Sequence, residues 1–481
     1  MTRHPSLYRL VLIALLVTTP ALAAADATTQ PNVLLISVDD LNDWTGCLGG
    51  HPQAKTPHID RLANRGTLFA NAHCQSPVCN PSRASLMTGR YPHTSGVYFL
   101  SPDLKSAPVL KDLVTLPESF AQHGYKTMAV GKLFHGGDRR FFQEYGGNNG
   151  GFGPRPKRKI SQPHGHPLWD WGAYPERDEL MPDMKAAQWA VAKLQEKHDK
   201  PFFMGVGFYR PHVPMYAPKP WFDMHPLDQI VLPKVQSDDR SDLSQYAINL
   251  TNLEHVSPEH SWVESSGQWP HAVQSYLAST TFADHCVGLV LDALDQSPYA
   301  NNTIVVLFSD HGFHLGEKQR WAKRSLWEDG TRVPLIIAGP GINKQQVCNR
   351  PAELIDIYPT LLDLANLPDD DDQEGQSLVP LLDQPESEWS YPAITSFGKG
   401  NYSIRSTRYR YIRYVDGSEE LYDHETDPNE WFNLADREAV TEVIASHARY
   451  LPTKEHEILP GKSTGHNAYS ASATALTNPS P

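Results

Sequence analysis

The sequence has few cysteines and a deficit of positive charge for its length. Only five of its 481 residues are cysteines, too few for a fold held together mainly by disulfide bonds. Because five is odd, at least one thiol has no partner within the chain; it is either a buried free thiol or a cysteine with a chemical role. The formal net charge of −13 argues against a nucleic-acid partner, since phosphate binding needs a basic surface. An anionic ligand would have to be held by a local cluster of cations.

The apolar run near the N-terminus is too short to span a bilayer. It covers residues 10–17, whereas a membrane helix needs about 20 apolar residues. Arg3 and Arg9 flank its start, and Ala21-Leu22-Ala23 provides a small-x-small cleavage pattern. We therefore predict a signal peptide over residues 1–23 and an exported protein, periplasmic or secreted, with no integral membrane association. An uncleaved anchor is the alternative.

Short apolar segments bounded by turn residues recur through the first three quarters of the chain. They are rich in Val, Ile and Phe, which is typical of strands buried on both faces of a mostly parallel sheet, and they cover residues 32–38, 127–130, 202–208, 303–308 and 333–338. Helical patterns alternate with them over residues 56–66 and 276–291. The alternation predicts an α/β sandwich with a large, mostly parallel sheet between helices.

The pattern changes near residue 384. Beyond it, residues 402–406, 409–415 and 420–422 resemble antiparallel strands, and apolar residues between 440 and 450 recur with a helical period. From residue 461 the chain is rich in Ser, Thr, Asn and Ala without any apolar period. We predict a main α/β domain over residues 29–384, a small C-terminal α+β subdomain over 385–460 in which a helix packs on an antiparallel sheet, and a disordered tail over 461–481.

Polar side chains directly follow four of the predicted strands. In order along the chain they are Asp39 and Asp40, Lys132 and His135, His212, and Asp310 and His311. In open α/β sheets the ligand crevice lies at the carboxyl ends of the strands, so these side chains should converge there. Any one pair could instead form a turn or a helix cap, but four such groups together indicate a site.

Three carboxylates meeting in this crevice predict a bound cation. Asp39, Asp40 and Asp310 would repel one another in a dry crevice unless a cation held them. Carboxylate oxygens are hard ligands, which favours calcium or magnesium, and we expect calcium.

Cys79 lies at the start of a helical pattern. Pro81 is suited to the first helical turn, which places Cys79 where free N–H groups favour an anion. A plain thiol here would have a lowered pKa and could be redox active. However, the stretch from Cys79 through Pro81-Ser82-Arg83 to Thr88-Gly89 resembles the sulfatase signature C-x-P-S-R-x-x-x-x-T-G. In that family the cysteine is converted to formylglycine.

Further motifs extend the resemblance from Asn32 to about Ala435. The chain is similar to type I sulfatases of the alkaline-phosphatase superfamily, in particular to iduronate-2-sulfatase-like members. The similar segments are 37–41 (SVDDL), 131–135 (GKLFH), 210–214 (RPHVP), 309–312 (SDHG) and 321–323 (WAK).

The resemblance implies roles for individual residues. One Ca²⁺ per chain would be bound by Asp39, Asp40, Asp310, His311 and the modified Cys79, with His311 replacing an Asn found in many sulfatases. Arg83 would hold the formylglycine. The residues around the sulfate would be Lys132, His135, His212 and Lys323, with His212 as general acid and His135 taking the proton that lets the carbonyl re-form. A formylglycine-generating or anaerobic sulfatase-maturing enzyme is the implied partner.

An aromatic and cationic insertion is a candidate for substrate binding. Residues 163–178 contain His164, His166, Trp169, Trp171 and Arg177, a mixture suited to stacking on a sugar and pairing with a carboxylate. Tyr98 is a similar candidate. Packing of a long loop is the alternative reading. The resemblance implies a sulfated polysaccharide or oligosaccharide, with uronic acid as one option.

Two rival functions follow from the same residues. One is a phosphonate monoester hydrolase or phosphodiesterase, because that branch of the superfamily also uses formylglycine. The other is an inactive sulfated-glycan-binding protein, which would require that Cys79 stays unmodified.

Overall fold

The computed structural model describes residues 1–2, 30–161, 168–252, 256–370, 372–463, 466 and 469. Apart from its first two residues, the predicted signal peptide lies outside the described residues. Within the described part of the chain, no helix is both long enough and apolar enough to cross a membrane.

An eight-stranded, mostly parallel sheet forms the centre of the molecule. Its strands, in spatial order, are β14 (Gln346–Cys348), β2 (Thr67–Phe69), β13 (Leu335–Ala338), β9 (Thr303–Ser309), β1 (Asn32–Val38), β7 (Phe202–Phe208), β4 (Lys126–Gly131) and β5 (Glu144–Tyr145). β1 pairs in parallel with both β7 and β9, as continuous apolar strands predict. The predicted α/β sandwich is confirmed.

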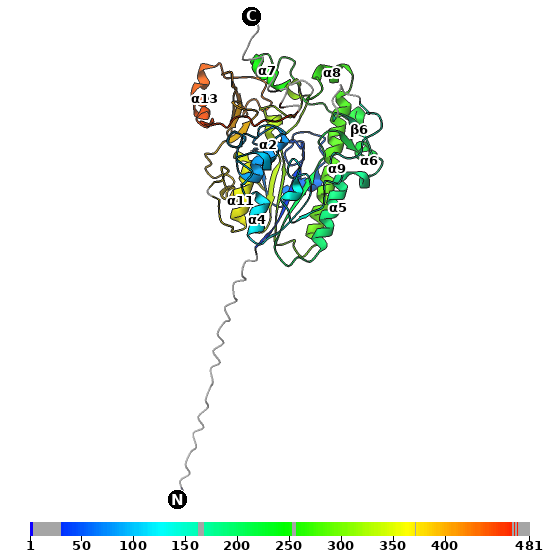
Figure 1. Ribbon diagram of the computed structural model, residues 1–481, viewed down its shortest axis with the longest axis vertical. Coiled ribbons are helices and arrows are strands. Elements are labelled where there is room, and N and C mark those ends of the chain that lie inside the picture. Colours follow the sequence, from blue (N-terminus) through cyan, green and yellow to red (C-terminus); the bar gives the residue numbers. More distant parts are fainter. Residues whose placement is uncertain are drawn as a thin grey trace.

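Helices cover both faces of this sheet (Figure 1). Alternate residues of β1 enter two separate cores: Val33 and Leu35 face one side, and Leu34 and Ile36 face the other. The first core is covered by α2 (Cys79–Thr88), α4 (Leu116–Gln122) and α11 (Ile357–Leu364). The second core is covered by α1 (Pro57–Ala63), α5 (Pro182–Gln195) and the long α9 (Trp269–Asp295). Burial of the central strands on both faces explains why they read as unbroken apolar runs.

The predicted strand over residues 333–338 is divided in the structure. β12 (Arg332–Val333) pairs with β3 (Ala72–His73), and β13 begins only after Pro334. Proline has no N–H to donate to a ladder, so a strand break at this residue is expected. β13 runs antiparallel to β9, which makes the large sheet mixed at this edge.

The small C-terminal sheet has four antiparallel strands. They are β16 (Ala393–Ser396), β17 (Tyr402–Arg405), β18 (Tyr409–Arg413) and β19 (Glu419–Asp423). The apolar residues of α13 (Thr441–Ala448) pack on Ile404, Tyr411 and Leu421 from this sheet, as predicted. Within the segment that we expected to be disordered, Tyr469 is buried, and its hydroxyl donates a hydrogen bond to the carbonyl oxygen of Lys399.

The carboxyl ends of the central strands meet at one edge of the sheet. Val38 lies beside Phe208 on one side and beside Ser309 on the other, so the residues that follow all three strands emerge together. At the end of β4, Gly131 has φ +78° and approaches Gly207 so closely that an added Cβ would lie 1.9 Å from the Gly207 carbonyl oxygen. A glycine is therefore required where β4 delivers Lys132 to this edge.

Candidate metal and catalytic site

Helix α2 brings Cys79 to the edge where the strands end. Cys79 is the first residue of the helix rather than the residue before it, and Val78 is the extended N-cap. The helix ends at Gly89, whose φ of +67° is the left-handed conformation typical of a C-terminal cap. One turn into the helix, the Ser82 hydroxyl donates to the carbonyl oxygen of Asp310 at 2.5 Å, which fixes α2 to the end of β9.

Four buried side chains form a cluster that could hold a cation. The ligand atoms of Asp39, Asp40, Cys79 and His311 all lie within 4.8 Å of one another. Asp310, the fifth predicted ligand, adjoins them: its Oδ2 is 3.6 Å from His311 Nε2. Asp40 Oδ2 is buried and has no hydrogen-bond partner. A buried carboxylate oxygen without a hydrogen-bond partner is unfavourable unless a positive charge lies beside it. This atom therefore fits a hard cation.

Three cations surround the carboxylates. Lys132 Nζ lies 2.5 Å from Asp39 Oδ2, and Arg83 Nε lies 2.8 Å from Asp310 Oδ2. Lys323 Nζ donates to Asp40 Oδ1 at 2.6 Å and lies 3.3 Å from Cys79 Sγ. Each lysine therefore contacts one acidic residue of the cluster, and Lys323 also contacts the sulfur atom.

The surrounding cations give the two adjacent aspartates different pKa values. Burial raises the pKa of Asp39, but Lys132, His212 and Arg83 more than offset this and hold that pKa well below its usual range. Burial raises the pKa of Asp40 to about 7, although Lys323 and His311 oppose the rise. Asp40 is thus the carboxyl group with most to gain from an added cation, which would favour its ionised form.

The two predicted acid–base histidines lie at the same edge. His212 Nε2 is 3.8 Å from Asp40 Oδ2, while its Nδ1 is 2.5 Å from the Val213 carbonyl oxygen. Burial, and then Lys323, lower the pKa of His212 well below its usual value. Burial, and then Lys132, lower the pKa of His135 to about 3. Both imidazoles are neutral at pH 7 when no ligand offsets the nearby cations.

The structure contradicts part of the predicted substrate-binding set. Trp169, Trp171 and Tyr98 are each only 1% exposed, so they cannot offer a ring face to a sugar. The two tryptophans pack in an apolar core with Phe313 and residues of α9, and Tyr98 packs in the core below the small sheet. The alternative reading, packing of a long loop, is correct for the two tryptophans. Arg177 is exposed, and His164 and His166 lie outside the described residues.

Sequence reasoning missed Phe152 and Arg324. The Phe152 ring lies 4.6 Å from the His212 ring, centroid to centroid, and 5.7 Å from Lys132 Nζ. Arg324 is 7% exposed, and burial lowers its pKa to about 10, although the nearby Cys79 and Asp40 oppose the fall. Nothing in the sequence marks Phe152. Arg324 could have been found, since it follows the predicted Lys323 directly.

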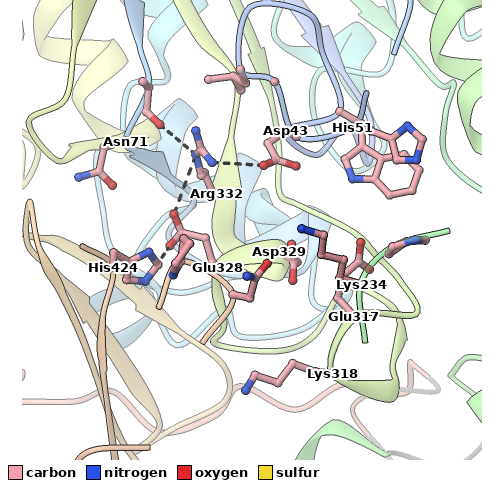
Figure 2. A pocket seen from close by; sticks show the side chains of 18 of the residues that line it. Asp43, His51, Asn71, Lys234, Glu317, Lys318, Glu328, Asp329, Arg332 and His424 are labelled. Carbon is pink, nitrogen blue, oxygen red and sulfur yellow. Dashed lines mark hydrogen bonds and ion pairs between the residues drawn. The ribbon is translucent and has the colours of Figure 1, made fainter. Parts of the chain in front are cut away.

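A separate polar pocket is lined in part by residues of the segment that follows β1, among them Asp43 and His51 (Figure 2). One of its arginines is paired with two of its acidic residues: Arg332 lies between Asp43 and Glu328, at 3.2 Å from Asp43 Oδ2 and 3.9 Å from Glu328 Oε1. None of the predicted catalytic residues lines it. The cluster around Cys79 is therefore the better candidate for the site of chemistry.

Comparison with known proteins identifies two family models. The Sulfatase family model matches residues 31–367, and the model described as N-sulphoglucosamine sulphohydrolase, C-terminal, matches residues 316–457. A sulfatase of Formosa agariphila is 42% identical over 88% of this chain and 86% of its own length. The iduronate 2-sulfatase of Mus musculus is 31% identical over 71% of this chain and 70% of its own length.

Solved structures share the fold over nearly the whole chain. A structure described as a 2-O GAG sulfatase is 25% identical, covers 93% of this chain and 94% of its own, and has a TM-score of 0.69. A phosphonate monoester hydrolase of Agrobacterium radiobacter has a TM-score of 0.73 at 22% identity, covering 88% of this chain and 94% of its own. The latter likeness concerns the fold alone.

Proposed function

Because this chain belongs to the sulfatase family, as its motifs predicted, we propose that it hydrolyses a sulfate ester of a uronic-acid-containing glycan, using Cys79 after oxidation to formylglycine. The protein is a sulfuric ester hydrolase of the alkaline-phosphatase-like fold. The observation that carries the proposal is the position of Cys79 Sγ, 3.2 Å from His311 Nε2 and 3.3 Å from Lys323 Nζ, beside the carboxylate cluster. The glycan assignment rests on the iduronate and 2-O GAG sulfatases among the similar proteins.

One Ca²⁺ fits the carboxylate cluster. Asp39, Asp40, Asp310 and His311 would hold it, together with the modified side chain of Cys79. The ion would supply positive charge to the sulfate oxygens and to the attacking hydroxyl. Calcium is preferred because the set is dominated by carboxylate oxygens and magnesium is more reluctant to lose its waters.

Formylglycine supplies what a thiol lacks, a hydrated aldehyde with two hydroxyls on one carbon. The buried Arg83 fits a role in holding that group: it belongs to the same helix as Cys79, and its Nη1 donates to the Lys132 carbonyl oxygen at 2.7 Å. A formylglycine-generating or anaerobic sulfatase-maturing enzyme would act as partner during synthesis. Export to the periplasm or beyond is the proposed location.

Lys132 and Lys323 would bind the sulfate group from two sides. Burial lowers the pKa of each lysine, but the neighbouring acidic residues outweigh burial and raise both values, so each stays charged. Negative charge grows on the sulfate and leaving oxygens during attack, and preplaced ammonium groups stabilise that growth.

The two histidines would act at opposite ends of the reaction. A sulfate held between the lysines offsets their charge and thereby raises the pKa of His212 toward the range in which it can protonate the leaving oxygen. His135, whose pKa is about 3, is neutral and can accept the proton of the remaining hydroxyl. Transfer of that proton lets the carbonyl re-form as sulfate leaves.

Peptide mass spectrometry and turnover test the proposal together. We expect the peptide containing Cys79 to show replacement of the thiol by an aldehyde after co-expression with a maturing enzyme. We expect the modified protein to release inorganic sulfate, and Cys79→Ala to release none while keeping its thermal unfolding midpoint. Turnover by Cys79→Ala, or an unmodified cysteine in an active enzyme, would contradict the nucleophile assignment.

Parallel assays with 4-nitrophenyl sulfate and an aryl phosphate diester address the rival phosphonate or phosphodiester activity. We expect the sulfate to be the better substrate by kcat/KM. A rate dominated by the phosphorus ester would replace the sulfatase proposal with the rival one.

A further inference from the structure

A pocket of about 980 Å³ adjoins the segment that carries Lys323. Its lining combines guanidinium groups with aromatic rings: Arg240, Arg320, His260, Trp269 and Trp321. It is distinct from the cluster around Cys79, since none of the predicted catalytic residues lines it.

Arg320 connects this pocket to the catalytic segment. Its Nη2 donates to the carbonyl oxygens of Lys323 and Arg324, so its guanidinium lies against the peptide that positions the catalytic lysine. The backbone N–H of Arg324 donates in turn to the Pro77 carbonyl oxygen, two residues before Cys79. Residues 320–324 thus connect the pocket to the segment that carries the nucleophile.

No ion pair joins Arg320 to an acidic residue within the described part of the chain. Arg320 is 4% exposed, and its Nε has no hydrogen-bond partner among the described residues. No ion pair joins Arg240 to an acidic residue within the described ranges, because the adjacent Asp239 binds Lys318 at 2.7 Å. Burial, and then repulsion by Arg324 and Arg240, lower the pKa of Arg320 to about 9.

The acidic residues that the structure describes at the pocket, Glu259 and Glu264, form no ion pair with these arginines. Glu264 Oε1 lies 3.6 Å from His260 Nε2 and is 55% exposed, and Glu259 is exposed at the pocket. Unpaired buried guanidinium groups are costly, and the cost is unexpected in a chain of net charge −13. An anion bound in the pocket would offset this cost in free energy.

We infer that this pocket binds a second anionic group of the substrate, a carboxylate or a sulfate other than the one that is cleaved. The inference rests on the proposed function, since it places the pocket beside the sulfate that reacts. Guanidinium groups bind carboxylate and sulfate oxygens through paired N–H donors, and the rings of Trp269 and His260 are suited to the apolar face of a sugar. The favoured substrate is then an oligosaccharide with at least two negative charges rather than a singly sulfated sugar.

Arg240→Gln is the most direct test. Arg240 is half-buried, and no side-chain hydrogen bond or ion pair of this residue is recorded among the described residues, so the substitution should leave the fold intact. The probes are a uronic-acid disaccharide carrying a scissile sulfate and a second sulfate, and 4-nitrophenyl sulfate. We expect Arg240→Gln to raise KM for the disaccharide about tenfold more than KM for 4-nitrophenyl sulfate.

Two chemically altered disaccharides identify the anionic group. One has its carboxylate converted to a methyl ester, and the other lacks the second sulfate. If Arg240→Gln no longer raises KM for one of these derivatives, the group altered in that derivative is the ligand of the pocket. This result supports the inference. Equal effects of Arg240→Gln on both original probes, or undiminished sensitivity with both derivatives, would overturn it. Arg449→Gln, an exposed arginine whose side chain contacts only the Ser446 carbonyl oxygen, is the matched control and should change neither KM.

A binding measurement separates the pocket from turnover. Calorimetry of the disulfated disaccharide with Cys79→Ala, with and without Arg240→Gln, reports affinity in a protein that does not react. A wild-type enzyme that cleaves no sulfate ester contradicts the proposed function, and calorimetry still decides the role of the pocket. Equal affinity of the two Cys79→Ala proteins would refute the pocket alone.

Discussion

Asp40 combines an unfavourable backbone conformation with several contacts that hold it. Its φ of +63° lies in the left-handed region, which costs most residues about 1–3 kcal/mol and which aspartate tolerates better than most. The backbone N–H donates to Asp310 Oδ1 at 3.2 Å, and the backbone carbonyl accepts from the Tyr276 hydroxyl at 2.7 Å. These contacts turn the Asp40 carboxylate toward Lys323 and Cys79.

Asp40→Asn tests the cation site without changing side-chain shape. Asparagine tolerates the left-handed conformation, so we expect the fold to persist. The loss of one negative charge should lower the bound calcium, measured by atomic emission, and should lower kcat/KM by about 100-fold or more, since a metal ion contributes several kcal/mol to such reactions. Asp112→Asn, at an exposed ion pair with Lys111, is a control expected to retain both. A variant Asp40→Asn with full calcium content and full activity would contradict the assignment.

His212→Ala tests the general acid. If the imidazole protonates the leaving oxygen, its removal should cost more with alkyl sulfates, whose leaving groups are poor, than with 4-nitrophenyl sulfate. The measurement is kcat/KM across a series of leaving groups, compared with His123→Ala, which changes a histidine bonded only to its own helix. Equal losses across the series would exclude the role.

At the scale of elements, the site is produced by strands that end together. The four strands that carry site residues could be predicted because burial on both faces gives unbroken apolar runs, and the residues that follow such runs stand at one sheet edge. This rule predicted that four residues lie together at that edge: Asp39, Lys132, His212 and Asp310. Cys79 and Lys323 follow no predicted strand; the start of a helical pattern marked Cys79, and the family resemblance pointed to both.

The orientation of the aromatic insertion could not be predicted from its composition. Trp169 and Trp171 are buried because residues distant in sequence cover them: the Trp169 indole donates to the Val256 carbonyl oxygen, and the Trp171 indole donates to Gln268. A tryptophan-rich loop looks the same in sequence whether its rings face a ligand or a core. For the same reason, the arginine-lined pocket beside Arg320 left no pattern in the sequence.

Glu353 makes the junction between β15 (Ala352–Glu353) and β16 pH-dependent. Burial, and then Asp356, raise its pKa to about 8, while bonds from the Ile394 N–H and the Tyr91 hydroxyl oppose the rise. Because the folded-state pKa is raised, the stability contributed by protonated Glu353 is fully present below about pH 4.5 and is lost as pH rises through about 8. We expect Glu353→Gln to flatten the fall of the unfolding midpoint between pH 5 and 9, measured by calorimetry. An unchanged pH profile would show that Glu353 does not titrate in this range.

At the scale of the whole molecule, a buried ion network joins the small sheet to the catalytic segment. Arg410, on β18, is fully buried; it bonds Glu430 Oε1 at 2.6 Å, contacts Glu328, and donates to the Leu326 carbonyl oxygen at 3.0 Å. Trp327 adds a bond from its indole to Glu420 of β19 at 2.8 Å. The residues directly after Lys323 are therefore anchored by the C-terminal sheet through buried bonds.

Arg410→Ala should consequently affect both stability and catalysis. Removing one member of a buried ion network leaves Glu328 and Glu430 short of positive charge, which typically costs about 3–5 kcal/mol of unfolding free energy. The freed segment 323–328 should also hold Lys323 less firmly, so kcat for 4-nitrophenyl sulfate should fall. The matched control is Arg413→Ala on the same strand, whose ion pair with Glu419 is 41% and 30% exposed and should contribute at most about 1 kcal/mol. Chemical denaturation together with kcat measures both effects, and a loss of stability without any loss of kcat would show that the sheet supports the fold but not the position of Lys323.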